Sequence, residues 1–211
     1  YRLHDLSADK RQCNFVIDRP DNKPSLSIRL NIPGRHNALN AAAALCVGLG
    51  LGKDFNHLKN GISKFTGTRR RFEFRGSADG IRVYDDYAHH PTEIEALINA
   101  VQTLYPLKKI TGIFQPHLFS RTRDFFDGFA KQLSRLDEVV LLPIYPAREE
   151  PIEGVSSDAL IDAISSGNKH LLSANEVVGF IASRENEVVL TIGAGDIDRI
   201  IEPLKIKLEE R

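Results

Sequence analysis

The sequence predicts an α/β protein with a mostly parallel sheet, and three observations support this fold class. From residue 81 onward, short apolar runs alternate with segments whose apolar residues recur at helical spacing. Polar clusters follow several of the apolar runs, at the point where a strand of an open sheet would end. The chain has 211 residues, enough for one or two domains with a sizeable core. Strands that alternate with helices favour a parallel sheet with crossover connections.

The first third of the chain has a different pattern. Short strands are expected at 14–17 and 25–31, because polar and apolar residues alternate in the second of these runs. A helix is expected at 36–49, after the breaker Pro33-Gly34, and its Ala, Leu and Val content on nearly all sides predicts deep burial. A second helix is expected at 55–64.

The rest of the chain divides into regular elements. Residues 71–86 read as two strands joined across 77–80. Further strands are expected at 110–114, 138–142 and 187–192, with a weaker one near 170–172. Helices are expected between them, at 92–105, 123–136, 157–165, 175–184 and 196–209. A domain boundary is expected between Gly76 and Gly80, giving domains 1–78 and 79–211.

Composition excludes several classes of function. Lys+Arg and Asp+Glu both total 28, so the net charge is zero and no nucleic-acid partner is expected. Cys13 and Cys46 are too few for a disulfide framework or a zinc motif, which fits a reduced, cytoplasmic setting. The longest apolar run, 41–51, is too short to span a bilayer, so no membrane partner is expected.

The most informative stretch is DDYAHHPTE at residues 85–93. It joins an apolar run to a helical pattern, and Pro91 suits a first helical position because its missing N–H would have no partner there. So many polar groups at a strand-to-helix junction favour a binding or catalytic edge, although a buried turn could hold them for structural reasons alone.

Asn37 and Asn40 stand three residues apart at the start of the first helix, so both amides share a face. A carboxamide can pair with the amino and ring nitrogens of adenine. Capping of a helix or a turn is the commoner use of Asn. Spacing alone leaves both uses open.

Three guanidinium groups, from Arg69, Arg70 and Arg71, precede a predicted strand. The planar fork of arginine suits phosphate oxygens, whereas most such runs are solvated surface. In an extended chain, Arg69 and Arg71 would point together and Arg70 away.

Further polar loops follow the later strands. QPHLFSRTR at 115–123 offers an imidazole and cations that suit a small carboxylate ligand, and a capped turn with exposed arginines has about equal weight. YPAREEP at 145–151 is expected to border the same edge. GAGD at 193–196 is an incomplete dinucleotide fingerprint, for which tight strand–helix packing is the favoured explanation. The sequence contains no Gly-x-x-x-x-Gly-Lys-Ser/Thr phosphate loop.

Taken in order, these motifs resemble the Mur ligase family. The resemblance runs from about residue 32 to the end and rests on GRHNALNAAAA, GTRRRFEF, DDYAHHPTEI, FQPHLFSRTRDFFDGFA, YPAREEPIEGVSS and TIGAGDI. It implies that residues 1–78 are the C-terminal part of a central ATP-binding domain. Residues 79–211 would then form the Rossmann-like, amino-acid-binding C-terminal domain.

The implied activity is an ATP-dependent joining of L-alanine to UDP-N-acetylmuramate through an acyl phosphate, in peptidoglycan biosynthesis. ATP, L-alanine and UDP-N-acetylmuramate would be the small-molecule partners. Mg²⁺ is the implied cofactor besides ATP, with its ligands upstream, so no metal residue is assigned in this chain. A family member that recycles muropeptides shares the DDYAHHPT-type motif and is the nearest alternative.

The resemblance also implies roles for particular residues. Asn37 and Asn40 match the pair that contacts adenine, and Asp86 matches the acid that contacts the ribose hydroxyls. Arg71 matches the phosphate-binding arginine and is a catalytic candidate.

The amino-acid side of the expected site comes from two loops. Tyr87, His89, His117 and Arg121 would line the site for the amino acid and the acyl phosphate. Arg121 is the candidate for the carboxylate, and His89 is a second catalytic candidate. Many relatives have Arg where this chain has Leu118, which would leave more of the anion binding to His117 and Arg121.

Two other classes compete with this interpretation. Asp85, Asp86, His89 and His90 could hold a divalent metal in a metal-dependent phosphoesterase. The glycines of 193–196 could belong to a dinucleotide-binding module, but the fingerprint is incomplete.

Overall fold

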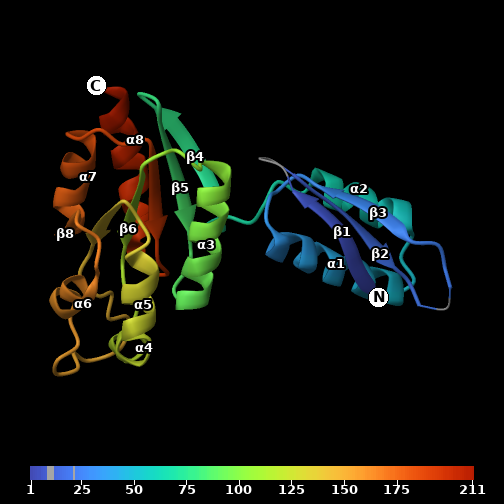
Figure 1. The fold of residues 1–211 in the computed structure, drawn as a ribbon, viewed down its shortest axis with the longest axis horizontal. Coiled ribbons are helices and arrows are strands. Elements are labelled where there is room, and N and C mark those ends of the chain that lie inside the picture. The colour runs from blue at the N-terminus through green and yellow to red at the C-terminus, as the bar shows by residue number, and fades with distance from the viewer. Residues whose placement is uncertain (9–11, 21) are drawn as a thin grey trace. The chain divides into compact units, whose positions relative to one another are not determined.

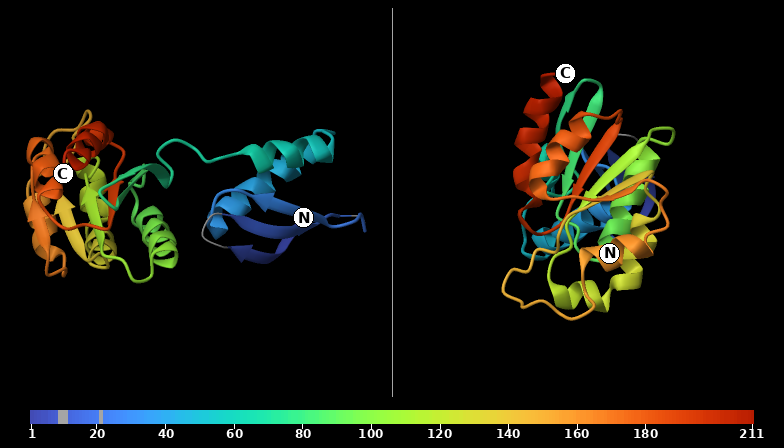
Figure 2. Two further views of the ribbon diagram at one scale, coloured as in Figure 1. Left: turned by 90° about the horizontal axis from the view of Figure 1, so that it is seen from above. Right: turned by 90° about the vertical axis from the view of Figure 1, so that its left-hand side faces the viewer.

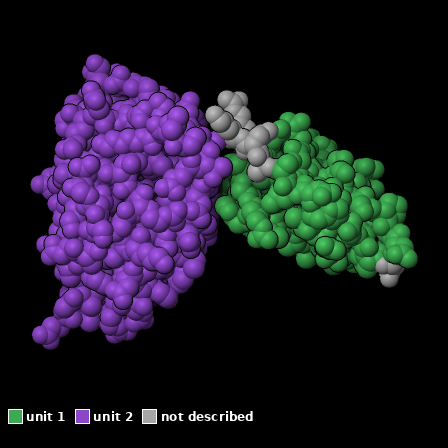
Figure 3. All heavy atoms as spheres, viewed as in Figure 1, with its two compact units in different colours: residues 1–68 green, residues 69–211 purple. Residues whose placement is uncertain are grey.

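The computed structural model describes residues 1–8, 12–20 and 22–211, which form two compact units, Tyr1–Thr68 and Arg69–Arg211 (Figure 3). The division falls before the boundary expected between Gly76 and Gly80. The reason is that β4 (Glu73–Ala78) pairs with β5 (Ile81–Asp86), so the whole hairpin belongs to the second unit. Within the described residues, no helix combines the length and the apolar character needed to cross a membrane.

The first unit is an antiparallel sheet with two helices (Figure 1). Its strands, in spatial order, are β1 (Arg2–Ala8), β2 (Cys13–Asp18) and β3 (Leu26–Leu30). The sequence analysis did not single out β1 as a strand. Alternate residues of β2 and β3 are buried, as expected for a sheet with one covered face. The helices are α1 (Arg35–Gly50) and α2 (Phe55–Lys64), and the Asp54 side chain caps α2 by accepting from the His57 N–H.

Helix α1 is less buried than its composition predicts. Ala38, Ala42 and Leu45 are buried in the core of the first unit, whereas Val47 is 63% exposed and Leu51 is 71% exposed. The expectation of burial on nearly all sides is therefore wrong for this chain, because the sheet and α2 cover only one face of the helix.

The second unit contains a six-stranded sheet in the order β4-β5-β9-β6-β7-β8. The added strands are β6 (Ile110–Phe114), β7 (Glu138–Leu141), β8 (Lys169–Leu171) and β9 (Val188–Ile192). All neighbouring pairs are parallel except β4 with β5. That hairpin turns at Asp79-Gly80, where both residues have positive φ, a pattern typical of tight hairpins. The predicted α/β fold with a mostly parallel sheet is confirmed.

Helices cover both faces of this sheet (Figure 2). Helices α3 (Pro91–Leu104), α5 (Phe126–Leu133) and α6 (Ser157–Ala163) contribute to one apolar core. On the other face lie α7 (Ala174–Ala182), the 3₁₀ helix η1 (Asp196–Ile200) and α8 (Ile201–Glu209). The start of α3 is as predicted, with Pro91 in its first turn and the His90 ring accepting from the Thr92 N–H.

Two predicted helices are divided in the structure. The one expected at 123–136 consists of α4 (Phe119–Asp124) and α5, which meet at Phe125. Phe125 has φ −119° and ψ 20°, outside the helical region, and its ring centre lies 4.3 Å from that of His90. The helix expected at 196–209 begins as η1 and continues as α8.

The core of the second unit predicts the cost of removing a buried leucine. Leu133 on α5 is fully buried, whereas Leu107 is 94% exposed. We expect Leu133→Ala to lower the free energy of unfolding by about 2–5 kcal/mol, because it removes packed atoms and leaves a cavity. The matched change Leu107→Ala should stay within about 0.5 kcal/mol of the wild type. Urea denaturation followed by NMR signals of the second unit measures both. Equal effects would contradict this packing.

Candidate functional site

The polar loops of the second unit meet at the carboxyl edge of its sheet. Strands β5, β9, β6 and β7 are parallel, so the segments that follow them emerge side by side. Backbone hydrogen bonds join these segments: Gly193 donates to Asp86, Gln115 to Ile192, and Leu142 to Phe114. The structure therefore brings the 85–93 and 115–123 stretches to one edge.

Asp86 lies at the end of β5 and is almost fully buried. Its Oδ2 accepts from the Phe72 N–H at 2.7 Å, and its Oδ1 accepts from the Ala88 N–H at 2.8 Å. Burial raises the pKa of this carboxyl group to about 6, although the two N–H groups and Arg71 oppose the rise. Each carboxyl oxygen of Asp86 therefore already accepts one backbone N–H and keeps a second lone pair that can accept another hydrogen bond.

Arg71 projects from the turn that precedes β4. Its side chain is 52% exposed, and its Nη1 lies 3.4 Å from Glu93 Oε1. Glu93 also accepts from the His89 N–H at 3.0 Å. Burial would raise the pKa of Glu93, but His89 and Arg71 together outweigh it and lower that pKa. Glu93 thus connects two of the predicted site residues, Arg71 and His89.

Tyr87 and His89 lie next to each other after β5. Their rings are 5.3 Å apart, edge to face, and the Tyr87 side chain reaches the surface. The His89 Nδ1 lies 2.8 Å from the Tyr87 carbonyl oxygen, which can only accept, so Nδ1 carries the proton.

His117 and Arg121, which stand four residues apart, form a hydrogen-bonded pair. Nη1 of Arg121 lies 3.1 Å from Nδ1 of His117 and donates to it, since a guanidinium cannot accept. Burial, followed by the charges of Arg121 and His89, lowers the pKa of His117. The ring is therefore a neutral imidazole with its proton on Nε2. It stacks on Tyr145 at 5.6 Å with an interplanar angle of 14°.

The 145–151 loop supports this pair. The backbones of Tyr145 and Leu118 are bonded, and Leu118 adopts a positive φ of 74° where α4 begins. Glu149 accepts from the Ser120 hydroxyl at 2.5 Å and from the Ser120 N–H at 2.9 Å, which lowers the pKa of Glu149. The loop thereby fixes the start of the helix that carries Arg121.

The three arginines do not lie on an extended chain. Arg70 and Phe72 have positive φ values of 56° and 47°, so the segment is a turn. The Arg70 guanidinium bonds Asp85 Oδ2 at 3.1 Å, whereas Arg69 and Arg71 are exposed. Arg70 thus differs from its two neighbours in being partly buried, and the extended chain that was expected for this segment is not found.

Two residues of the 85–93 stretch have structural partners. Asp85 is fully buried between Arg70 and the Thr191 hydroxyl, which bonds its Oδ1 at 2.8 Å. Burial raises the pKa of Asp85, and these two partners oppose the rise. The His90 ring, in turn, bonds Thr92 at the start of α3. Asp85, Asp86 and His90 are thus each engaged by separate protein groups, and no cluster of three His, Cys, Asp or Glu within the described ranges could hold a metal ion.

The adenine candidates belong to the first unit. Asn37 donates from Nδ2 to the Pro33 carbonyl at 2.7 Å, while Asn40 is exposed. Helix α1 begins after Gly34 without a side-chain cap. Asn37 therefore closes the turn before the helix rather than capping it.

The glycines of 193–196 allow close packing. A Cβ on Gly193 would lie 2.7 Å from the Gln115 carbonyl oxygen, and one on Gly195 would lie 2.4 Å from Gln115 Oε1. Gln115 itself bonds Asp196 and the Ile197 N–H. The structure thus agrees with the packing explanation for these glycines.

The α/β unit with these loops at its carboxyl edge matches a known class of domain. The model described as Mur ligase, glutamate ligase domain, matches residues 70–195, and the chain belongs to the Mur ligase family. It is 43% identical over 211 residues to a UDP-N-acetylmuramate–L-alanine ligase from Cytophaga hutchinsonii, covering 100% of this chain and 45% of that protein. The protein of the same name from Christiangramia forsetii is 48% identical over 193 residues, covering 91% and 43%.

Solved structures agree with this assignment. A UDP-N-acetylmuramate–alanine ligase from Thermotoga maritima matches with a TM-score of 0.81 at 28% identity, covering 99% of this chain and 45% of that one. A murein peptide ligase from Psychrobacter arcticus shares the fold, with a TM-score of 0.72 at 22% identity over 99% of this chain and 44% of that one. The chain spans about half the length of the relatives it matches.

Several residues of this edge had no role assigned from the sequence. Glu93 stands inside the motif, and its position four residues after His89 was the available signal. Tyr145 and Glu149 lie in a loop that was expected at this edge without a stated function. Arg70 was given no role because an extended chain would direct it away from Arg69 and Arg71. Its contacts depend on a turn that the local sequence pattern does not predict.

The buried carboxyl group of Asp86 predicts a dependence of stability on pH. Its pKa rises from 3.8 to about 6 on folding, so the folded chain holds this proton more tightly than the unfolded chain. As the pH rises from about 4 to about 7, Asp86 therefore lowers the free energy of unfolding by up to about 3 kcal/mol. We expect Asp86→Asn to remove this contribution, because an amide does not titrate.

Urea denaturation at a series of pH values measures the slope. Asp162→Asn is the matched control, since Asp162 is exposed on α6 and should keep the wild-type slope. If all three proteins lost stability equally with rising pH, the raised pKa of Asp86 would be refuted.

Proposed function

We propose that this chain supplies the C-terminal half of an ATP-dependent ligase that joins L-alanine to UDP-N-acetylmuramate in peptidoglycan biosynthesis. One observation carries the proposal. A UDP-N-acetylmuramate–L-alanine ligase aligns with the whole of this chain at 43% identity. The paired His117 and Arg121, at the edge where ligands of such sheets bind, supply a fitting amino-acid site.

The proposed chemistry begins with transfer of the γ-phosphoryl group of ATP to the lactyl carboxylate of the sugar, which gives an acyl phosphate and ADP. The amine of L-alanine then attacks the acyl carbon and forms the amide bond. Inorganic phosphate leaves with the electrons of the broken C–O bond, and the amine loses a proton. The residues of this chain contribute by orienting the reactants and neutralising charge.

The amino-acid side of the reaction is assigned to the His117–Arg121 pair. Arg121 is held by an acceptor that is neutral, so its charge is not cancelled and stays available for a carboxylate. His117 keeps an Nε2–H that can donate to an oxygen of the acyl phosphate. Tyr87 and His89 would border this site, with the His89 ring held through its Nδ1 on the Tyr87 carbonyl oxygen.

Four residues are assigned to binding of the nucleotide. Arg71 has a half-exposed guanidinium with one long contact to Glu93, which suits a phosphate oxygen. The spare lone pairs of Asp86 would accept from the ribose hydroxyls. Asn37 and Asn40 would contact adenine, as the family resemblance implies. We assign the first unit, residues 1–68, to the central ATP-binding domain and the second unit, residues 69–211, to the C-terminal domain, in place of the division at 78–79 that the sequence led us to expect.

Mg²⁺ does not fit a site built from this part of the protein. Within the described residues there is no group of three His, Cys, Asp or Glu arranged to hold a cation. We therefore assign its ligands to the upstream part that the relatives have, and derive no step through a metal. Small-molecule substrates without nucleic acid or membrane partners, and a cytoplasmic location, belong to the same proposal.

Two alternatives are less well supported. A muropeptide-recycling ligase has the same fold, but the murein peptide ligase structure is 22% identical to this chain, against 43% and 48% for two alanine ligases. A metal-dependent phosphoesterase would need Asp85, Asp86, His89 and His90 together. The first two carboxylates are instead bound by Arg70 and by backbone amides.

The proposed function predicts a dependence on L-alanine. The full-length protein that contains this chain should release phosphate from ATP only when UDP-N-acetylmuramate and L-alanine are both present. The chain of 211 residues should release none by itself, because it contains no phosphate loop. A phosphate-release assay measures both. Release that is independent of the amino acid would overturn the proposal, as would ligation by the isolated chain.

Arg121 predicts a loss of affinity for the amino acid. We expect Arg121→Lys to raise the KM for L-alanine about ten-fold or more, since a lysine cannot bind a carboxylate through two parallel hydrogen bonds. Arg123→Lys is the matched control, because Arg123 lies on the same helix and is paired with the exposed Asp124. Steady-state kinetics with varied L-alanine measure both. An unchanged KM in the Arg121 variant would remove this residue from the amino-acid site.

A further inference from the structure

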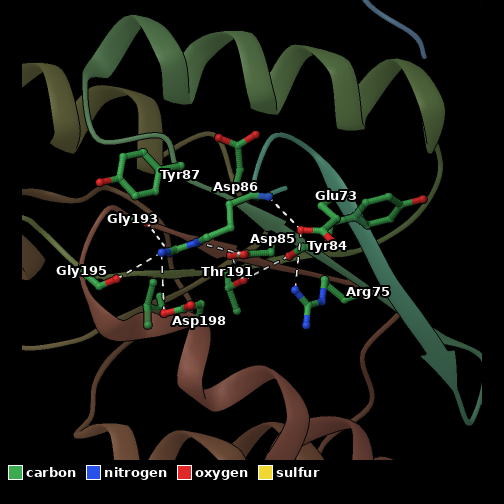
Figure 4. A network of polar contacts seen from close by, with 12 residues as sticks. Glu73, Arg75, Tyr84, Asp85, Asp86, Tyr87, Thr191, Gly193, Gly195 and Asp198 are labelled. Carbon is green, nitrogen blue, oxygen red and sulfur yellow. Dashed lines mark hydrogen bonds and ion pairs between the residues drawn. The ribbon is translucent and has the colours of Figure 1, made fainter. Parts of the chain in front are cut away.

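The Arg70 side chain contacts several groups at the carboxyl edge. Figure 4 shows the labelled partners of this network, among them Asp85, Gly193, Gly195 and Asp198. The Arg70 Nε donates to Asp85 Oδ2 at 3.1 Å, and its Nη2 donates to the Gly193 carbonyl at 2.8 Å. Its Nη1 donates to the Gly195 carbonyl at 3.3 Å and lies 3.6 Å from Asp198 Oδ1. These acceptors come from β5 and from the segment that follows β9.

The backbone and the face of Arg70 are also engaged. Its N–H donates to Glu73 Oε2 at 2.8 Å, and its carbonyl accepts from the Tyr87 N–H at 2.7 Å. The guanidinium lies 5.0 Å from the centre of the Tyr87 ring, a cation–π contact. Tyr87, a proposed substrate-side residue, is therefore held by Arg70 through both its backbone and its ring.

The contacts continue from the glycines to the amino-acid side. Gly195 packs so closely that an added Cβ would lie 2.4 Å from Gln115 Oε1 and 2.9 Å from Tyr145 Cβ. Tyr145 in turn stacks on His117, which bonds Arg121. The glycine segment is thus held between Arg70 on one side and the support of the His117–Arg121 pair on the other.

We infer that Arg70 is a positioning residue, which fixes Tyr87 and the Gly193–Gly195 backbone and through them the proposed amino-acid site. The inference rests on the proposed function for its kinetic part only. Arg70 also fixes the position of Arg71, because hydrogen bonds hold the turn on both sides of Arg71. Before it, the Arg70 carbonyl accepts from the Tyr87 N–H, and after it, the Phe72 N–H donates to Asp86. Neither of these roles requires Arg70 to touch a substrate.

Lysine cannot replace Arg70 in this arrangement. The planar guanidinium donates in several fixed directions at once, towards a carboxylate and two carbonyls. A single ammonium group keeps the charge but cannot reach acceptors that diverge in this way. Arg70→Lys therefore separates the geometry of the contacts from the presence of a cation.

The experiment compares Arg70→Lys with Arg69→Lys, the same change at the exposed neighbour. In the full-length protein, Arg70→Lys should raise the KM for L-alanine on the order of ten-fold, and Arg69→Lys should leave it unchanged. A purely structural role would reduce the active fraction and the apparent kcat but not this KM. An unchanged KM in a folded Arg70→Lys protein would overturn the kinetic part.

A second measurement does not depend on ligase activity. In the 211-residue chain, hydrogen exchange by NMR should show faster exchange of the Tyr87 amide in Arg70→Lys than in Arg69→Lys, and a shift of the His117 ring signals. Equal exchange rates and unshifted ring signals would refute the positioning role. If the wild-type enzyme lacked ligase activity, the proposed function would be wrong. The hydrogen-exchange and ring-signal measurements would still test the positioning role of Arg70.

A double variant guards against loss of folding. Arg70→Lys leaves Asp85 partly unpaired, and a buried carboxylate without its partner destabilises the fold. Arg70→Gln combined with Asp85→Asn removes both charges. This protein should fold and still show the raised KM and the faster Tyr87 exchange. A folded double variant with wild-type values for both would overturn the inference.

Discussion

The parallel pairing of β5, β9, β6 and β7 is the constraint on which the candidate site depends. Parallel strands end at the same edge, so residues from four distant parts of the chain emerge together without any attraction between their side chains. The backbone bonds between the segments after the strands extend the ladder beyond the sheet. The positions of Asp86, His117 and Tyr145 are therefore set by the sheet.

Electrostatics divides this edge into parts with different uses. Burial raises the pKa of the Asp86 carboxyl group to about 6, so that the group is half-protonated near pH 6, while backbone N–H groups hold its oxygens in place. His117 is kept neutral by burial and by the charge of Arg121. The neutral imidazole of His117 orients the Arg121 guanidinium through a hydrogen bond and does not neutralise its charge. The nearby carboxylates Asp85 and Glu93 form ion pairs with Arg70 and Arg71, so they do not neutralise the charge of Arg121.

Local patterns predicted much of the fold and part of the site. The α2 boundaries, the β4–β5 hairpin and Pro91 at the start of α3 follow from capping, turn and proline chemistry that acts within a few residues. The exposed face of α1 was not predictable, because composition does not say which neighbours a helix has. The contacts of Arg70 were missed for a related reason. They depend on two positive φ values in a turn and on glycine carbonyls more than a hundred residues away.

The strand that comes last in the second unit stands near the middle of its sheet, with β5 on one side and β6 on the other. Asp85 on β5 and Thr191 on β9 are bonded although 106 residues separate them in the chain. Until β9 has been synthesised, the sheet cannot be completed. The β4–β5 hairpin and the β6–β7–β8 strands are then two separate pieces, and the edges of β5 and β6 that pair with β9 stay unpaired. Contacts this far apart close slowly, and open strand edges are prone to aggregate. The two pieces can join only after β9 has been made, so the sheet is completed once nearly all of the second unit has been synthesised.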